Sequence, residues 1–232
     1  MSELLPLLMV PALGCTGELY AAQTAAVSDR EVVVADATGH DSIAAMAAEI
    51  LETAPPRFAL AGLSMGGYVV LELWRQAPDR IGKLALLDTQ ARPDAPAAAD
   101  VRKRMIELGE DGRLDMIHEA LWPRLVAPNR REDRALEIVV RRMLQEVGAE
   151  AFVRQQRAIL GRVDSRPTLP TITVPTLVLV GADDQLTPPD LAREMAAAIP
   201  KADLVMVPGS GHLSTLEKPD AVNAALAGWL VR

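Results

Sequence analysis

The sequence of 232 residues predicts an α/β fold in which helices flank a mostly parallel sheet of about six strands. Short apolar runs alternate along the chain with longer runs of helical periodicity, which is typical of βα units. The apolar runs are continuous rather than alternating, as in strands that are buried on both faces. Half of the residues are apolar but only 3% are aromatic, a composition that favours helices stacked on a buried sheet. The length fits one domain, or one domain with a modest insertion.

The predicted strands are the apolar runs at Leu4–Val10, Glu31–Asp36, Arg57–Leu63, Lys83–Asp88, Pro175–Gly181 and Ala202–Pro208. The predicted helices lie between and after these runs, at Leu19–Val27, Ser42–Glu52, Met65–Gln76, Pro189–Ala198 and Pro219–Leu230. Because strands and helices alternate, we expect the strands to run parallel and to be joined by helical crossovers.

The segment from about Ala97 to Arg162 shows no strand pattern. It consists of charged amphipathic windows that are interrupted near Pro123 and Pro128. We therefore expect a helical cap inserted between two strands of the sheet. On this interpretation residues 1–96 and 163–232 form the core, and residues 97–162 form the cap.

The charge and cysteine content exclude several kinds of protein. A formal net charge of −7 argues against a nucleic-acid partner, which would require a basic surface. The single cysteine, Cys15, cannot form an internal disulfide, and the first apolar run is much shorter than the roughly 20 residues of a membrane span. We expect a cytoplasmic protein with no membrane association. The sequence also lacks a dinucleotide-binding glycine fingerprint after the first strand and a cluster of His and Cys ligands, so no cofactor and no metal are expected.

A serine stands between glycines where a predicted strand meets a predicted helix. The stretch Gly62–Gly66 matches G-x-S-x-G, which places Ser64 on a sharp strand-to-helix turn. The small residues leave room for the strand and the helix to approach each other, and the N–H of Met65 would point toward the space in front of the serine hydroxyl. The alternative is a glycine-rich turn whose serine only caps the helix.

A serine nucleophile needs a base, and the sequence holds three histidines. His212 follows the last predicted strand, in a loop that can bring its imidazole over the ends of the neighbouring strands. His40 follows the second predicted strand, where it could line the site or form a local hydrogen bond. His118 lies in the helical insertion and is interpreted as a surface or packing residue. His212 is therefore the predicted base.

The base in turn needs a carboxylate that orients it. Asp183 and Asp184 follow the fifth predicted strand, and Asp88 ends the fourth. All three lie at the carboxyl ends of strands, where open α/β sheets form their binding sites. We favour Asp184 over Asp183, and either of them over Asp88.

With Ser64, Asp184 and His212 in this order, the chain resembles the α/β-hydrolase superfamily. The motifs that carry the resemblance are "GLSMGG", "VGADDQLTPP", "GSGHLSTLEKPDAV" and, more weakly, "DATGHDS". The resemblance implies an α/β-hydrolase fold with a helical cap, with Ser64 as nucleophile, His212 as base and Asp184 as acid. The chain most resembles small hydrolases that are distantly related to lactonases and esterases.

The sequence departs from the family pattern after the first strand. Family members usually carry His-Gly there, whereas this chain has Pro11 and Ala12. By position Leu13 would supply one backbone N–H of the oxyanion hole, with Gly14 as the alternative, and Met65 would supply the other. The opening hairpin of the family is also absent, which is consistent with a sheet of about six strands.

The resemblance implies a serine hydrolase that cleaves a carboxylic ester, lactone or thioester of a small molecule through an acyl-enzyme. A carbon–carbon bond hydrolase and a haloperoxidase-like or lyase-like enzyme would use the same three residues. A non-catalytic, hydrolase-like binding protein is the alternative of another class. Specificity is expected from the cap, where Trp122, Met105, Leu125 and Met143 are the predicted pocket walls. Arginines of the cap could bind a substrate carboxylate.

Overall fold

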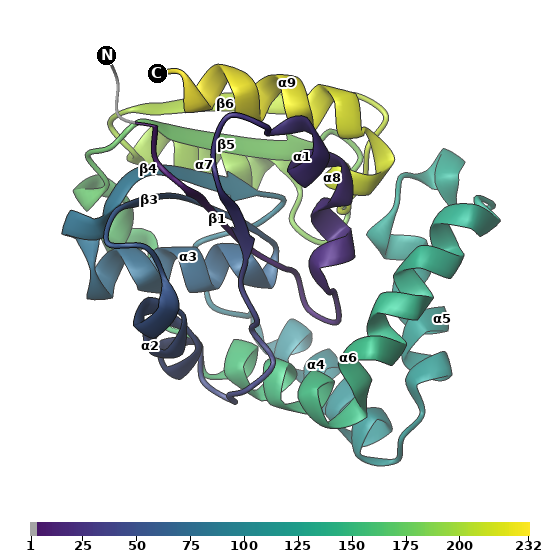
Figure 1. Cartoon of the computed structure of the whole chain (residues 1–232). Coiled ribbons are helices and arrows are strands. Elements are labelled where there is room, and N and C mark those ends of the chain that lie inside the picture. Colours follow the sequence, from purple (N-terminus) through teal and green to yellow (C-terminus); the bar gives the residue numbers. More distant parts are fainter. Residues whose placement is uncertain (1–3) are drawn as a thin grey trace.

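A computed structural model describes residues 4–232, and within this range the strands form one parallel six-stranded sheet (Figure 1). The strands are β1 (Leu7–Val10), β2 (Val32–Val34), β3 (Phe58–Leu63), β4 (Ile81–Leu87), β5 (Thr176–Gly181) and β6 (Ala202–Val207). Their order across the sheet is β2-β1-β3-β4-β5-β6. Five of the six predicted apolar runs contain one of these strands, and the sixth, Lys83–Asp88, overlaps β4, which begins two residues earlier at Ile81. The predicted fold class is confirmed. Residues 1–3, which the predicted core included, lie outside the described residues.

Helices cover both faces of the sheet. One face is covered by α2 (Ile43–Thr53), α3 (Met65–Gln76) and α7 (Pro189–Ala198), and the other by α1 (Ala21–Ala26) and α9 (Pro219–Leu230). The remaining short elements are α8 (Ser214–Glu217) and 3-10 helices at Gly17–Tyr20, Pro78–Arg80, Pro128–Arg130 and Arg166–Thr171. None of the helices in the described range is long and apolar enough to cross a membrane.

The central strands alternate between the two faces, as the period of two in a strand requires. In β3, Phe58 and Leu60 pack with α2 and α3, whereas Ala61 and Leu63 pack on the opposite face. All six residues of β3 are buried, because helices cover both sides of the sheet at this position. This arrangement explains why the strand reads as a continuous apolar run.

The expectation that every strand is buried on both faces is wrong for the two edge strands. Residues of β2 are only partly buried, and Met206 in β6 is 44% exposed. An edge strand has a neighbour on one side only, and the flanking helices do not extend fully over it. The sequence pattern does not distinguish these strands from the central ones, because Val, Leu and Met also occupy their partly exposed positions.

Three α-helices lie between β4 and β5, within the described range, in the segment that was predicted to be helical. They are α4 (Pro96–Glu110), α5 (Leu114–Leu125) and α6 (Arg134–Leu160), and Figure 1 shows them grouped along one side of the molecule. Helix α5 continues through Pro123 and ends at Leu125, two residues beyond the predicted break. Helix α6 is interrupted at Gly148, whose backbone (φ 78°, ψ 164°) is not helical. It therefore consists of two helical pieces.

Candidate active site

Ser64 lies in a sharp turn between β3 and α3. Its backbone (φ 55°, ψ −114°) lies in a region that residues other than glycine rarely adopt. Three hydrogen bonds hold this conformation. The Ser64 N–H donates to the Leu87 carbonyl (3.0 Å), while the Ser64 carbonyl accepts from the Gly67 N–H (2.9 Å) and the Thr89 hydroxyl (2.7 Å). The strained residue is thus fixed by β4 and by the first turn of α3.

The glycines around Ser64 are sites of close backbone approach. A Cβ atom on Gly62 would lie 2.4 Å from the Gly66 carbonyl oxygen, and one on Gly66 would lie 2.0 Å from the Val10 carbonyl oxygen. A Cβ on Gly67 would lie 2.4 Å from the Thr89 hydroxyl oxygen. Side chains at these positions would separate α3 from β1, β3 and the segment after β4.

We predict that Gly66→Ala destabilises the protein by at least about 3 kcal/mol, because its methyl group would displace the backbone of β1. Gly228→Ala in α9 is the matched control, since no described atom beyond its chain neighbours and its own helix backbone lies within 4 Å of a Cβ built there. Alanine in a helix is expected to leave the stability equal or raise it by about 1 kcal/mol. Denaturant unfolding measures both variants. Equal stability of the two would contradict the close approach at Gly66.

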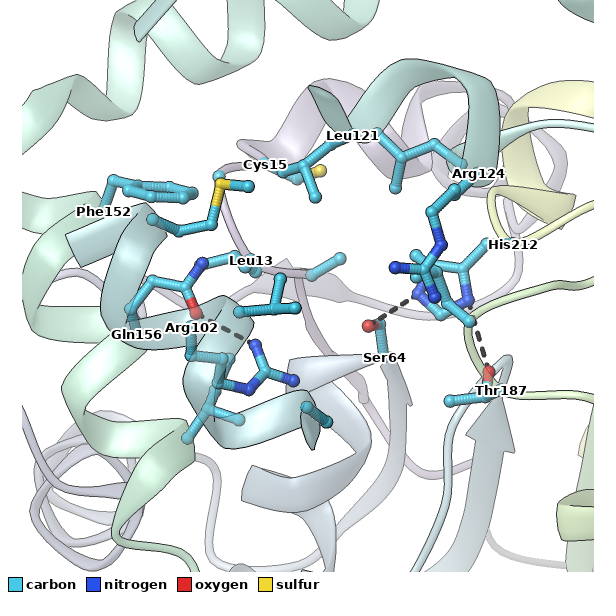
Figure 2. Close-up of a pocket in the computed structure, with 18 of the residues that line it drawn as sticks. Leu13, Cys15, Ser64, Arg102, Leu121, Arg124, Phe152, Gln156, Thr187 and His212 are labelled. Carbon is cyan, nitrogen blue, oxygen red and sulfur yellow. Dashed lines mark hydrogen bonds between the residues drawn. The ribbon is translucent and has the colours of Figure 1, made fainter. Parts of the chain in front are cut away.

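Ser64, His212 and Asp184 form one continuous chain of hydrogen bonds, of which Figure 2 shows the bond between Ser64 and His212. The Ser64 Oγ lies 2.8 Å from His212 Nε2, and His212 Nδ1 lies 2.8 Å from Asp184 Oδ2. The His212 and Asp184 side chains are both buried. Because Nδ1 faces a carboxylate, the proton belongs on Nδ1 and Nε2 is left to accept the proton of the serine hydroxyl.

The loop after β5 fixes the orientation of Asp184. Its Oδ1 accepts from the N–H groups of Leu186 (2.8 Å) and Thr187 (3.0 Å), and its Oδ2 accepts from the Thr187 hydroxyl (2.7 Å). Thr187 Oγ1 also lies 3.2 Å from His212 Nδ1. Sequence reasoning missed Thr187. An Asp side chain in a loop commonly accepts a hydrogen bond from the backbone N–H two residues on, as Asp184 does from Leu186. The neighbouring Asp183 is exposed and does not reach the imidazole.

Charge and burial shift the pKa values of His212 and Asp184 in opposite directions. Burial acts to lower the pKa of His212, but the charge and hydrogen bond of Asp184 raise it above the usual value overall. Burial likewise acts to raise the pKa of Asp184, but the charge and hydrogen bond of His212 lower it overall. Asp184 is therefore ionised and His212 is a stronger base than an isolated histidine.

Asp88 lies behind this chain of hydrogen bonds and is fully buried. Its carboxyl accepts from the Gly181 N–H (2.8 Å) and from the Ser214 hydroxyl, and it makes no hydrogen bond to His212. Burial, together with the nearby charge of Asp184, raises the pKa of Asp88 to about 8. Asp88 thus connects β4, β5 and the start of α8 and does not orient the imidazole directly.

The loop that carries His212 is bonded to the end of α5. The N–H groups of His212 (3.0 Å) and Leu213 (3.1 Å) both donate to the Leu125 carbonyl. The carboxylate of Glu217 accepts from the N–H groups of Gly211 and Ala127, each at 2.8 Å. Burial raises the pKa of Glu217. Sequence reasoning missed this carboxylate, because its two partners can be recognised only once the chain is folded.

Two backbone N–H groups lie at the places that the sequence indicated for an oxyanion hole. Met65 is the first residue of α3, and neither its N–H nor that of Leu13 donates to another described residue. The N–H of Gly14 donates to Gln155 Oε1 (2.9 Å) and is therefore occupied. Gly14 adopts φ +65°, which turns the chain after β1. Of the two alternatives after β1, Leu13 is the one with a free donor.

A cavity of about 410 Å³ opens in front of Ser64 and His212, between the sheet and α4–α6. Of the predicted pocket walls, Met105 and Leu125 line this cavity, whereas Trp122 and Met143 do not. The indole N–H of Trp122 donates to the Arg131 carbonyl (2.9 Å), and its ring packs in the core with Met143.

The other two histidines lie away from Ser64. His118 is buried, stacks on Trp122 with 5.9 Å between ring centroids, and lines the cavity. Its interpretation as a packing residue therefore holds, but it is not on the surface. His40 is partly exposed, lies 3.5 Å from Glu49 Oε2 and does not line the cavity. Of the three histidines, His212 alone reaches the serine.

Comparisons with known proteins agree with this architecture. The sequence profile described as "Alpha/beta hydrolase family" matches residues 7–225. A Mycobacterium tuberculosis protein named as a candidate non-heme bromoperoxidase, BpoC, is 31% identical over 183 residues, which cover 77% of this chain and 69% of the relative.

Two solved enzymes are similar in both sequence and structure. A thermophilic esterase from Thermogutta terrifontis is 30% identical with a TM-score of 0.85, and the match covers 98% of this chain and 89% of the esterase. The enol-lactonase from Burkholderia xenovorans LB400 is 26% identical with a TM-score of 0.88, and the match covers 100% of this chain and 93% of the lactonase. The family profile spans nearly the whole described chain, and the sheet, the strained serine turn and the cavity agree with it. The chain belongs to the alpha/beta hydrolase family.

Proposed function

We propose that this protein is a serine hydrolase that cleaves a carboxylic ester or lactone of a small molecule. The observation that carries the proposal is the continuous chain of hydrogen bonds from Ser64 through His212 to Asp184 at the wall of the cavity. The similarity to an esterase and to an enol-lactonase supports ester chemistry. No cofactor is part of the proposed reaction.

In the first half of the reaction Ser64 acquires the acyl group. His212 Nε2 accepts the proton of the Ser64 hydroxyl while Oγ attacks the ester carbonyl carbon. The N–H groups of Met65 and Leu13 stabilise the negative oxygen of the tetrahedral intermediate. The carbon–oxygen bond to the alcohol then breaks, and His212 returns its proton to the leaving alkoxide.

In the second half water releases the acid. His212 Nε2 accepts a proton from water as the water oxygen attacks the acyl carbon, and the bond to Ser64 Oγ breaks. Ser64 recovers its proton from His212. Asp184 stabilises the imidazolium in both halves, and Thr187 keeps the Asp184 carboxylate in place.

We also propose that residues 97–162 act as a cap that shapes the substrate cavity. Helix α4 contributes Met105, α5 contributes Leu121 and Leu125, and α6 contributes Leu144 and other walls. These side chains are mainly apolar, so the acyl or alcohol group of the substrate is expected to have an apolar part.

Labelling with a fluorophosphonate tests the proposal directly. The folded protein is expected to react at Ser64 and to hydrolyse p-nitrophenyl esters, with a preference for chain lengths that fit a cavity of about 410 Å³. Absence of labelling in folded protein would favour a non-catalytic binding protein. Labelling without hydrolysis of any ester in the panel would overturn the ester assignment and favour one of the other reactions that this set of residues can perform.

The pH dependence of kcat/KM offers a separate prediction. His212 must be neutral to accept the serine proton, and its pKa is raised above the usual value of 6.5. Activity is therefore expected to fall on the acid side with a midpoint above pH 6.5. In Asp184→Asn the residual activity should have a lower midpoint, because the group that raises the His212 pKa is lost. Profiles for p-nitrophenyl acetate measure both midpoints, and an unchanged midpoint in Asp184→Asn would contradict the assigned pair.

A further inference from the structure

The cavity carries more positive charge than the chain as a whole. The formal net charge of the chain is −7. Among the described residues that line the cavity, Asp94 is the only carboxylate, and it is paired with both Arg102 and Arg162. Arg124 is a further positive charge on the lining. An acidic protein that keeps unmatched positive charge in its cavity favours an anionic ligand there.

Arg124 differs from the arginines near it in having no protein partner. Arg130 pairs with Asp133 and donates to the Glu217 carbonyl, and Arg131 donates to the Pro123 carbonyl. Arg124 makes no hydrogen bond or ion pair with any other residue in the range 4–232. Figure 2 shows its side chain extending into the cavity toward the side where Ser64 and His212 lie.

The backbone beside Arg124 is fixed relative to His212. The next residue, Leu125, accepts hydrogen bonds from the N–H groups of His212 and Leu213 through its carbonyl. Gly211 packs so closely on this segment that a Cβ there would lie 2.5 Å from the Ala127 nitrogen. The last turn of α5 is thereby held on the loop that carries the histidine. The backbone of Arg124 is fixed beside that loop, and its exposed side chain lines the cavity.

We propose that Arg124 is a specificity-determining residue that binds a carboxylate group of the substrate. The preferred substrate is then an ester or lactone that carries a free carboxylate, so this inference rests on the proposed function. A guanidinium can donate two parallel hydrogen bonds to one carboxylate. A single guanidinium without an ion-pair partner matches the single negative charge of a carboxylate.

Binding to the Ser64→Ala variant tests the inference without requiring turnover. The probes are the monomethyl esters of straight-chain dicarboxylic acids of four to eight carbons. Each is paired with a neutral analogue whose carboxylate is replaced by a primary amide. For at least one chain length, the carboxylate is expected to bind about tenfold or more tightly than its amide partner, since a hydrogen bond to a charged group is worth this much. Dissociation constants from ligand-observed NMR give the ratio.

Two further variants in the Ser64→Ala background identify the residue responsible. Arg124→Gln should reduce the carboxylate-to-amide ratio to near one, whereas Arg104→Gln should leave it unchanged. Arg104 is an exposed arginine of α4 that does not line the cavity, so its loss removes the same charge from the same group of helices. Raising the salt concentration should weaken binding of the carboxylate probe but not of its amide partner.

The outcomes separate this inference from the proposed function. Selective binding of the carboxylate that depends on Arg124, together with no fluorophosphonate labelling of the protein that retains Ser64, would sustain the anion site and overturn the hydrolase. If Ser64 is labelled but the carboxylate and amide probes bind equally well, the hydrolase proposal stands and the anion site is overturned. A ratio that falls equally in Arg124→Gln and Arg104→Gln would also overturn it, because general charge rather than Arg124 would then be responsible.

Discussion

Replacing Ser64 by alanine is expected to abolish fluorophosphonate labelling and to lower kcat for p-nitrophenyl esters by at least about 10⁴-fold. The Ser64 hydroxyl forms the 2.8 Å hydrogen bond between Oγ and His212 Nε2. Without it the acyl-enzyme cannot form, and only direct attack by water in the presence of the oxyanion donors is left. Steady-state kinetics and mass spectrometry of the labelled protein measure the two effects.

The fold should survive this change. Alanine keeps the Cβ, and the backbone of residue 64 is held by hydrogen bonds from its own N–H and carbonyl, which do not involve the side chain. The melting temperature is therefore expected to remain close to that of the unaltered protein. Ser28→Ala, at an exposed serine, is the matched control and should retain full activity. Labelling that persists at another residue in Ser64→Ala would identify a different nucleophile.

The second large effect is expected from Asp184→Asn, which should lower kcat by about 10³- to 10⁴-fold. An amide cannot stabilise the imidazolium, and its NH₂ group can favour the tautomer in which Nε2 carries the proton. Asp184 Oδ2 lies 2.8 Å from His212 Nδ1, so the change acts directly on the base. Kinetics with p-nitrophenyl acetate measure the loss.

Asp88→Asn is the control for a buried carboxyl near the same histidine. It should reduce kcat by about tenfold at most, because Asp88 forms hydrogen bonds to Gly181 and Ser214 and none to the imidazole. With its pKa raised to about 8, Asp88 is largely protonated at neutral pH, so asparagine resembles its resting form in charge and shape. If instead Asp88→Asn had the greater effect, the assignment of Asp184 would be wrong.

Much of the fold could be predicted because local signals agree with the tertiary structure. Helices α3, α7 and α9 have the predicted bounds, since a glycine-rich turn or a proline marks where each begins. Helix α8 was missed because four residues are too few to show a helical period. The edge strands were misjudged because the number of neighbours of a strand is a property of the sheet and not of its own residues.

The placement of a candidate site residue could be predicted where the residue follows the end of a strand, and less well where it lies on the face of a helix. Ser64, Asp184 and His212 each follow a strand, and parallel strands bring such positions together. In α5, by contrast, Leu121 and Leu125 share the face that lines the cavity, while Trp122 is rotated by about 100° from Leu121 and turns toward the core. The helical period identifies two faces, but which one covers a cavity is decided by packing.

The bonds between Leu125, Ala127 and the histidine loop constrain how this architecture can change. The helices before and after residues 125–127 could be lengthened, shortened or exchanged, provided that two hydrogen-bonding groups keep their positions. These are the Leu125 carbonyl, which accepts from the histidine loop, and the Ala127 N–H, which donates to Glu217. The loop that carries His212 and the helices that line the cavity therefore share one point of attachment. A graft of foreign helices into this protein would have to preserve that short backbone path before any new specificity could be expressed.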